Sequence, residues 1–105
     1  MARKTRTKRW KRSKRLQAVY GITAGQWDKL YTLQGGICPI CHMPLRRPGN
    51  KEGKRAASVD HDHANGRVRG LLCYRCNKYR VGNNTLATAQ RMVAYLASDV
   101  DGRTI

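Results

Sequence analysis

The chain has 105 residues and a net charge of +16, with 22 Lys and Arg against 6 Asp and Glu. This length allows one small domain, and so strong a positive charge indicates a phosphate-rich partner, whether the protein is catalytic or simply a basic nucleic-acid-binding protein. The sequence contains no apolar stretch typical of signal peptides or membrane spans, so we expect an intracellular, cytoplasmic protein with no membrane partner.

Positive charge is concentrated at the N-terminus, where nine of the first 15 side chains are Lys or Arg and few are apolar. This composition is typical of segments that do not fold alone. Residues 1–15 are therefore predicted to be a flexible DNA-binding arm, able to extend a helix when DNA is bound. The predicted contacts are Arg3, Lys4, Arg6, Lys8, Arg9, Lys11, Arg12, Lys14 and Arg15.

A helical pattern begins after this arm. Thr23 and Gln26 match a capping box, in which each side chain bonds the backbone N–H of the other residue. Apolar residues at helical spacing follow, and a glycine pair ends the run. We predict a helix over residues 24–34, with Trp27 and Leu30 on its buried face.

A loop, a hairpin and two further helices are predicted beyond it. Residues 44–58 show neither helical nor strand periodicity. Residues 57–63 and 68–72 are predicted strands, and the Asn-Gly pair between them is typical of a hairpin turn. A short helix is expected at about residues 73–82, and a last helix at about residues 84–98.

Four cysteines stand in two Cys-x-x-Cys pairs. Four thiolates match the closed tetrahedral site of a structural zinc ion. A domain this small usually needs a bound metal or disulfides to be stable. Thiols stay reduced inside cells, which favours metal over disulfides. Two disulfides or four free buried thiols are the alternatives. The predicted ligands are Cys38, Cys41, Cys73 and Cys76, and the adjacent His42 is expected to face solvent.

Acidic, imidazole and amide side chains lie next to the cysteine pairs. Asp60 and His61 lie toward the end of the first predicted strand, and Asn77 follows the second pair. A hard cation such as Mg²⁺ or Mn²⁺ takes oxygen ligands, which Asp60 and Asn77 offer, and it keeps several waters. A neutral imidazole can take a proton from water, so His61 is the candidate general base for phosphodiester hydrolysis.

Three nearby residues have less specific roles. His63 faces the same way as His61 on an ideal strand and is a further catalytic candidate, although packing against the cysteine turn explains it equally well. Arg67 and Arg69 flank the hairpin turn and are predicted to contact the DNA backbone. A solvent-exposed charged face is the alternative for both.

The motifs combine into a specific resemblance. Residues 35–41 read Gly-Gly-Ile-Cys-x-x-Cys, residues 59–63 read Val-Asp-His-Asp-His, and residues 67–77 read Arg-Val-Arg-Gly-Leu-Leu-Cys-x-x-Cys-Asn. This combination is similar to the recombination endonuclease VII family, which belongs to the HNH (His-Me finger, ββα-metal) nucleases. The resemblance extends over about residues 20–82.

The resemblance implies roles for individual residues. Asp60 and Asn77 would hold the catalytic metal ion, His61 would activate water, and the four cysteines would hold structural zinc. Many HNH enzymes carry an Asn in the second strand that steadies the base. Val68 stands at about that position here, so another group must orient His61.

The expected fold is small α+β: a zinc-stapled ββα-metal finger with flanking helices and a basic N-terminal arm. The domain would span residues 16–105, with its zinc and ββα core at about residues 35–82.

The first expected function is a phage-type, metal-dependent DNA endonuclease that nicks or cuts, acting in the host cytoplasm if phage-encoded. The alternative is a non-catalytic, zinc-ribbon-like nucleic-acid-binding module. Monomer and homodimer are both compatible with the sequence.

Overall fold

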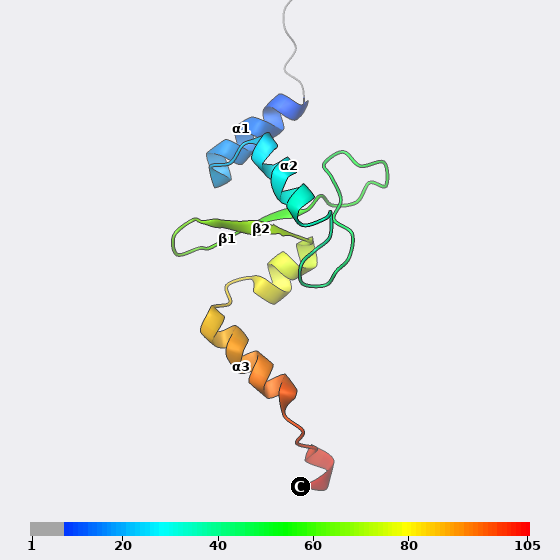
Figure 1. Cartoon of the computed structure of the whole chain (residues 1–105), viewed down its shortest axis with the longest axis vertical. Helices are drawn as coiled ribbons and strands as arrows, with labels where there is room; N and C mark the ends of the chain where they lie inside the picture. The colour runs from blue at the N-terminus through cyan, green and yellow to red at the C-terminus, as the bar shows by residue number, and fades with distance from the viewer. Residues whose placement is uncertain (1–7) are drawn as a thin grey trace, which may run out of the picture.

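The structure is a computed structural model that describes the backbone of residues 8–105 and the side chains of residues 11–105. Two N-terminal helices, a two-stranded hairpin, a π-helical segment and a C-terminal helix follow one another along it (Figure 1). The predicted small α+β class is confirmed. The predicted DNA contacts outside these bounds are Arg3, Lys4, Arg6 and the side chains of Lys8 and Arg9.

Helix α1 spans Lys8–Tyr20 and crosses the boundary predicted at residue 15 between arm and domain. Its second half packs against α2, where Leu16 is buried and the Arg12 guanidinium lies 4.6 Å from the centre of the Trp27 ring. Arg12 and Leu16 stand one turn apart on one helix face. The part of the predicted flexible arm from residue 8 onward is therefore helical, because one face of it has a packing partner.

Helix α2 spans Ala24–Leu33, one residue shorter than predicted. The Thr23 hydroxyl accepts a hydrogen bond from the Gln26 backbone N–H at 3.0 Å, and the Gln26 side-chain Oε1 accepts one from the Thr23 backbone N–H at 2.8 Å. These two bonds confirm the capping box. Trp27 is buried as predicted, and Leu30 is partly buried against the same core.

Strands β1 (Ser58–His61) and β2 (Val68–Leu72) form the predicted antiparallel hairpin. Strand β1 ends earlier than predicted because Asp62 begins the turn. The Asp62 carboxylate accepts a hydrogen bond from the Ala64 N–H at 2.8 Å, and its carbonyl accepts one from the Gly66 N–H at 2.7 Å. The connection is therefore longer than the two-residue turn that an Asn-Gly pair often makes.

The hairpin register sets which residues lie opposite one another. Val59 pairs with Leu71 and Asp60 with Gly70, and a bulge follows Asp60. The Gln34 amide, at the end of α2, bonds both backbone groups of Leu71, each at 2.8 Å. A Cβ on Gly70 would lie 2.8 Å from the Gln34 amide oxygen. The missing side chain at Gly70 therefore lets α2 bond the edge of β2.

The segment η1 spans Cys76–Val81 as a π-helix, inside the range predicted for a short helix. Helix α3 spans Leu86–Ala97, and Thr85 caps it by accepting a hydrogen bond from the Thr88 N–H. A 3₁₀ turn, η2, follows at Gly102–Thr104. Helix α3 has no buried residue and extends away from the hairpin (Figure 1). Within residues 8–105, no helix has both the length and the apolar character that a bilayer crossing requires.

Candidate functional site

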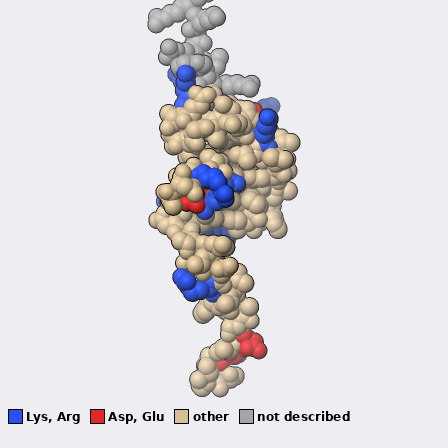
Figure 2. All heavy atoms as spheres, turned by 60° about the vertical axis from the view of Figure 1, so that its left-hand side comes forward, with Lys and Arg blue, Asp and Glu red and all other residues tan. Residues whose placement is uncertain are grey.

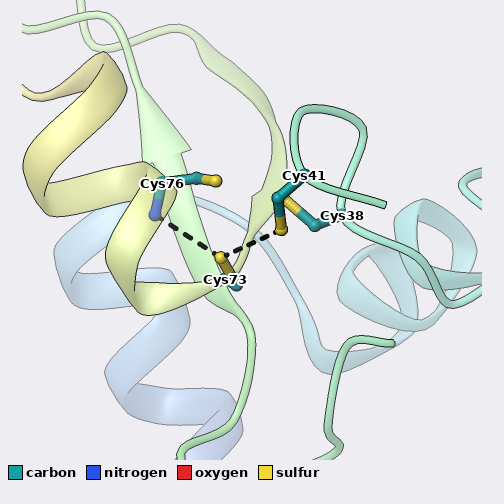
Figure 3. Close-up of side chains that lie close together, drawn as sticks. All are labelled: Cys38, Cys41, Cys73 and Cys76. Carbon is teal, nitrogen blue, oxygen red and sulfur yellow. Dashed lines mark hydrogen bonds between the residues drawn. The ribbon is translucent and has the colours of Figure 1, made fainter. Parts of the chain in front are cut away.

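Two segments far apart in the sequence bring four thiols to one centre. Cys38 and Cys41 come from the loop after α2, whereas Cys73 and Cys76 come from the junction of β2 and η1 (Figure 3). Their Sγ atoms lie within 4.8 Å of one another, and those of Cys41 and Cys73 are 3.6 Å apart. Four thiolates at ~2.3 Å from a zinc ion lie about 3.8 Å apart, so the set fits tetrahedral zinc.

The disulfide alternative does not fit this geometry. A disulfide requires two sulfur atoms at about 2.05 Å, and all four cysteines are free thiols. His42 is exposed and makes its described contact through the backbone, where its N–H donates to the Cys38 carbonyl at 2.9 Å. The four thiols could therefore hold a metal ion without His42.

The thiols differ in how readily they ionise. Burial opposes ionisation of Cys38, but hydrogen bonds from nearby backbone groups, that of Cys41 first, outweigh it and lower the pKa of Cys38 to about 6. Burial raises the pKa of Cys76 to about 12. The Arg80 guanidinium donates a hydrogen bond to the Cys76 Sγ at 3.0 Å. Four thiolates carry more negative charge than a divalent ion can neutralise. Arg80 places a positive charge beside this centre, which offsets part of the excess.

Asp60, the predicted metal ligand, is paired with Arg69 across the hairpin. The Asp60 side chain is 10% exposed. Arg69 Nε donates to Asp60 Oδ2 at 2.8 Å, and Arg69 Nη2 donates to Oδ1 at 3.0 Å. These hydrogen bonds raise the pKa of Arg69. In this structure Arg69 is therefore the counter-ion of Asp60, whereas the sequence predicts that it contacts DNA.

His61, the predicted general base, ends β1 and lies beside α1. Its ring centre is 5.5 Å from that of Tyr20 and 4.7 Å from that of His63. His63 lies in the turn and not in a strand, so the ideal-strand argument for its direction was wrong, although the two imidazoles do adjoin. An aromatic ring of α1 therefore adjoins the His61 ring, and Arg69 of β2 donates a hydrogen bond to the His61 backbone carbonyl at 3.4 Å.

Asn77, the second predicted metal ligand, is the second residue of η1. Its backbone N–H donates to the Cys73 carbonyl at 2.9 Å. Segment η1 contacts β1, so the elements that carry the predicted site adjoin. Within residues 8–105, the Asn77 side chain forms no hydrogen bond with Asp60 or His61. Joint binding of one ion by Asp60 and Asn77 stays a prediction.

Basic side chains surround the hairpin tip. Figure 2 shows Lys and Arg atoms there, beside acidic atoms, with further basic groups above and below them on the same face. Arg67 is exposed in the turn, and Lys11, Lys14 and Arg15 are exposed on α1. Arg12 differs from these neighbours because its guanidinium lies over Trp27. The exposed basic groups are placed where a polyanion can reach them.

Sequence reasoning missed three contacts at this site. Arg80 stands four residues after Cys76, a spacing that brings side chains together on a helix and could have revealed the contact. The pairing of Arg69 with Asp60 depends on the bulge, which no local pattern indicated. The contact of Tyr20 with His61 depends on how α1 packs against the hairpin.

Comparison with known proteins gives a family and two phage relatives. The profile of the family described as recombination endonuclease VII matches residues 13–98. The Gene 59 protein of Mycobacterium phage D29 is 46% identical over 84 residues, which are 78% of this chain and 47% of that protein. The Gene 59 protein of Mycobacterium phage L5 is 44% identical over 84 residues, 78% of this chain and 48% of that protein. The chain therefore spans about half the length of these relatives. No solved structure matches it.

Proposed function

The chain belongs to the recombination endonuclease VII family, and on this premise we propose that it is an endonuclease that hydrolyses DNA phosphodiester bonds with a divalent metal ion by an HNH mechanism. One observation carries the proposal most directly. The four-thiol centre joins the loop after α2 to the junction of β2 and η1, and η1 contacts the strand that carries Asp60 and His61. Asp60, His61 and Asn77 thus lie on adjoining elements next to the four-thiol centre.

Each candidate residue has a role that its chemistry supports. Asp60 and Asn77 offer the oxygen ligands that Mg²⁺ or Mn²⁺ prefers. Such an ion, when bound, would neutralise the charge that develops on the scissile phosphate. His61 would accept the proton of the attacking water, because imidazole takes up and releases protons near neutral pH. Its contacts with Tyr20 and His63 restrict how the ring can turn.

The structural ion and the basic surface would support this chemistry. Zinc held by the cysteines would fix η1 against the hairpin, so that the candidate residues keep their relative positions. Exposed basic residues of α1 and Arg67 would bind the DNA backbone. Binding through phosphates is electrostatic, so the affinity for DNA should fall steeply as salt increases.

A plasmid assay tests the proposal. Zinc-loaded protein is incubated with supercoiled DNA and Mg²⁺ or Mn²⁺, and the wild type is compared with His61→Asn. Loss of a general base lowers such rates by about 10²- to 10⁴-fold. His42→Asn is the matched control, since His42 is an exposed histidine in the loop of Cys38 and Cys41 and its backbone φ of 63° is one that Asn tolerates. Equal cutting by wild type and His61→Asn would remove His61 from the mechanism.

The second candidate function is a zinc-ribbon-like nucleic-acid-binding module without catalysis. The observation that favours it is the pairing of Arg69 with both oxygens of Asp60, since this pairing satisfies the carboxylate without a metal ion. Plasmid that is bound and retarded in a gel, but intact with every divalent ion tried, would support the binding module and contradict the nuclease.

A further inference from the structure

The ion pair between Asp60 and Arg69 uses the same oxygens that the proposed mechanism gives to a metal ion. A guanidinium that contacts both oxygens of a carboxylate is a strong, well-oriented partner. The Asp60 side chain is 10% exposed, so few other groups can approach it. A divalent cation next to the fixed guanidinium would face a like charge in a poorly solvated place, where repulsion is stronger than in water.

We propose that Arg69 is a positioning residue that changes partner: it holds Asp60 until a divalent cation takes the carboxylate oxygens, and it then contacts a phosphate of the bound DNA. This inference rests on the proposed function, because it assigns the cation to Asp60. It adds that Arg69 blocks the metal site until a cation binds. Once Arg69 has left Asp60, its guanidinium is available to contact a phosphate of the DNA.

The surroundings of Arg69 allow this change. Its side chain is 33% exposed, and it belongs to the bulge that distorts the pairing after Asp60. The residue lines the same hollow as Asp60, of ≈ 330 Å³. It also lines a hollow of ≈ 200 Å³ with His63 and Thr85, and the groove beside α3. A long side chain that borders these hollows can leave the buried carboxylate, together with its 3.4 Å hydrogen bond to the His61 carbonyl, and turn toward the hollow that His63 lines.

The exchange of Arg69 between Asp60 and phosphate affects two measurable properties: the affinity for a cation, and the coupling between cation binding and phosphate binding. The apparent affinity for a cation is lowered by the fraction of molecules in which Arg69 occupies Asp60. Cation binding and phosphate binding should also favour each other, since each stabilises the arrangement in which Arg69 has left the carboxylate.

Manganese binding without DNA tests the first property. Mn²⁺ affinity of the zinc-loaded protein is measured by electron paramagnetic resonance for the wild type, Arg69→Gln, Arg67→Gln and Asp60→Asn. We expect Arg69→Gln to bind Mn²⁺ about tenfold more tightly than the wild type, as expected if Asp60 is paired in some nine-tenths of molecules. Arg67→Gln is the matched control, with the same charge change in the exposed turn, and should alter affinity by no more than about twofold. Asp60→Asn should abolish the site.

The outcomes separate the inference from the function on which it rests. Equal Mn²⁺ affinity in the wild type and Arg69→Gln, lost in both when Asp60→Asn is added, would overturn the exchange and leave the metal site standing. Mn²⁺ binding that is insensitive to Asp60→Asn in every background would overturn the metal site itself, and the exchange with it.

A measurement on the unaltered protein covers the case in which Arg69→Gln loses zinc or helical signal. The Arg69 Nε–H resonance is followed by ¹⁵N NMR while Mg²⁺ is added. Release from the carboxylate should move this resonance toward its position in Asp60→Asn, with the same midpoint as metal binding. A resonance that stays in place at saturating Mg²⁺ would overturn the exchange.

Discussion

The two regions that flank η1 differ in how their apolar side chains are used. On the N-terminal side, Leu71 and Cys38 are fully buried, as is Cys76 at the start of η1 itself. On the C-terminal side, Leu86 and Leu96 of α3 are 75% and 79% exposed. Helix α3 forms as predicted and yet its apolar side chains stay exposed, so periodicity predicts an element but not whether it finds a partner.

The physical consequence is an uneven distribution of stability. Burial contributes about 25 cal/mol per Å² of apolar surface removed from water, so the region around the thiols gains far more than α3. A 12-residue helix is marginal in water by itself. The apolar side of α3 faces an open groove of ≈ 680 Å³ beside η1. We therefore expect the thiol centre to control folding and α3 to affect it little.

Removing zinc should have the largest effect. Binding of structural zinc contributes about 10–16 kcal/mol in small domains, which is comparable to the whole stability of a typical domain at about 5–15 kcal/mol. Chelation of the zinc-loaded protein should therefore abolish the hairpin and η1. Far-ultraviolet circular dichroism, with zinc content measured on the same samples, checks this. Retention of the signal after verified loss of zinc would contradict the central role of the thiol centre.

Leu71→Ala should cost about 2–5 kcal/mol of unfolding free energy, as is typical for a large side chain deleted from a core. Leu71 is fully buried opposite Val59. Urea unfolding of the zinc-loaded variant measures the change. A cost below about 1 kcal/mol would mean that this core is loosely packed and that zinc alone supports it.

Gly70→Ala should cost about 1–3 kcal/mol, because the new Cβ would collide with the Gln34 amide oxygen. Gln34→Ala should cost a similar amount through the lost bonds to Leu71. Once the amide is gone, adding Gly70→Ala should cost much less than it does alone. Urea unfolding of the two single variants and the double variant measures this coupling, and additive costs would show that the clash is relieved elsewhere.

Leu96→Ala should have the smallest effect, within about 0.5 kcal/mol, because the residue is on the surface of α3. It is the matched control for Leu71→Ala, with the same atoms removed from the exposed region. The same urea measurement applies. A cost near that of Leu71→Ala would mean that α3 is packed in solution, and the contrast between the two regions would then fail.

Much of this architecture follows from local spacing. The two cysteine pairs predicted the four-thiol centre, the Thr23–Gln26 pair predicted the start of α2, and the Asn-Gly pair predicted a hairpin. The spacing within each cysteine pair, the capping pair and the turn pair acts over a few residues, where covalent geometry limits the alternatives. The meeting of the two cysteine pairs, whose Cys41 and Cys73 are 32 residues apart, depends on the hairpin between them. The family followed from the same motifs.

Other features depend on how the elements pack. Charge density alone predicted a flexible arm, but α1 forms because Leu16 and Arg12 meet α2. The bulge brings Arg69 onto Asp60, and the packing of α1 brings Tyr20 beside His61. The sequence by itself therefore determined the spacing within each cysteine pair and the order of elements, because those depend on short-range patterns. Only the tertiary structure decided which partners the candidate catalytic side chains have, because register and packing join residues that no short-range rule connects.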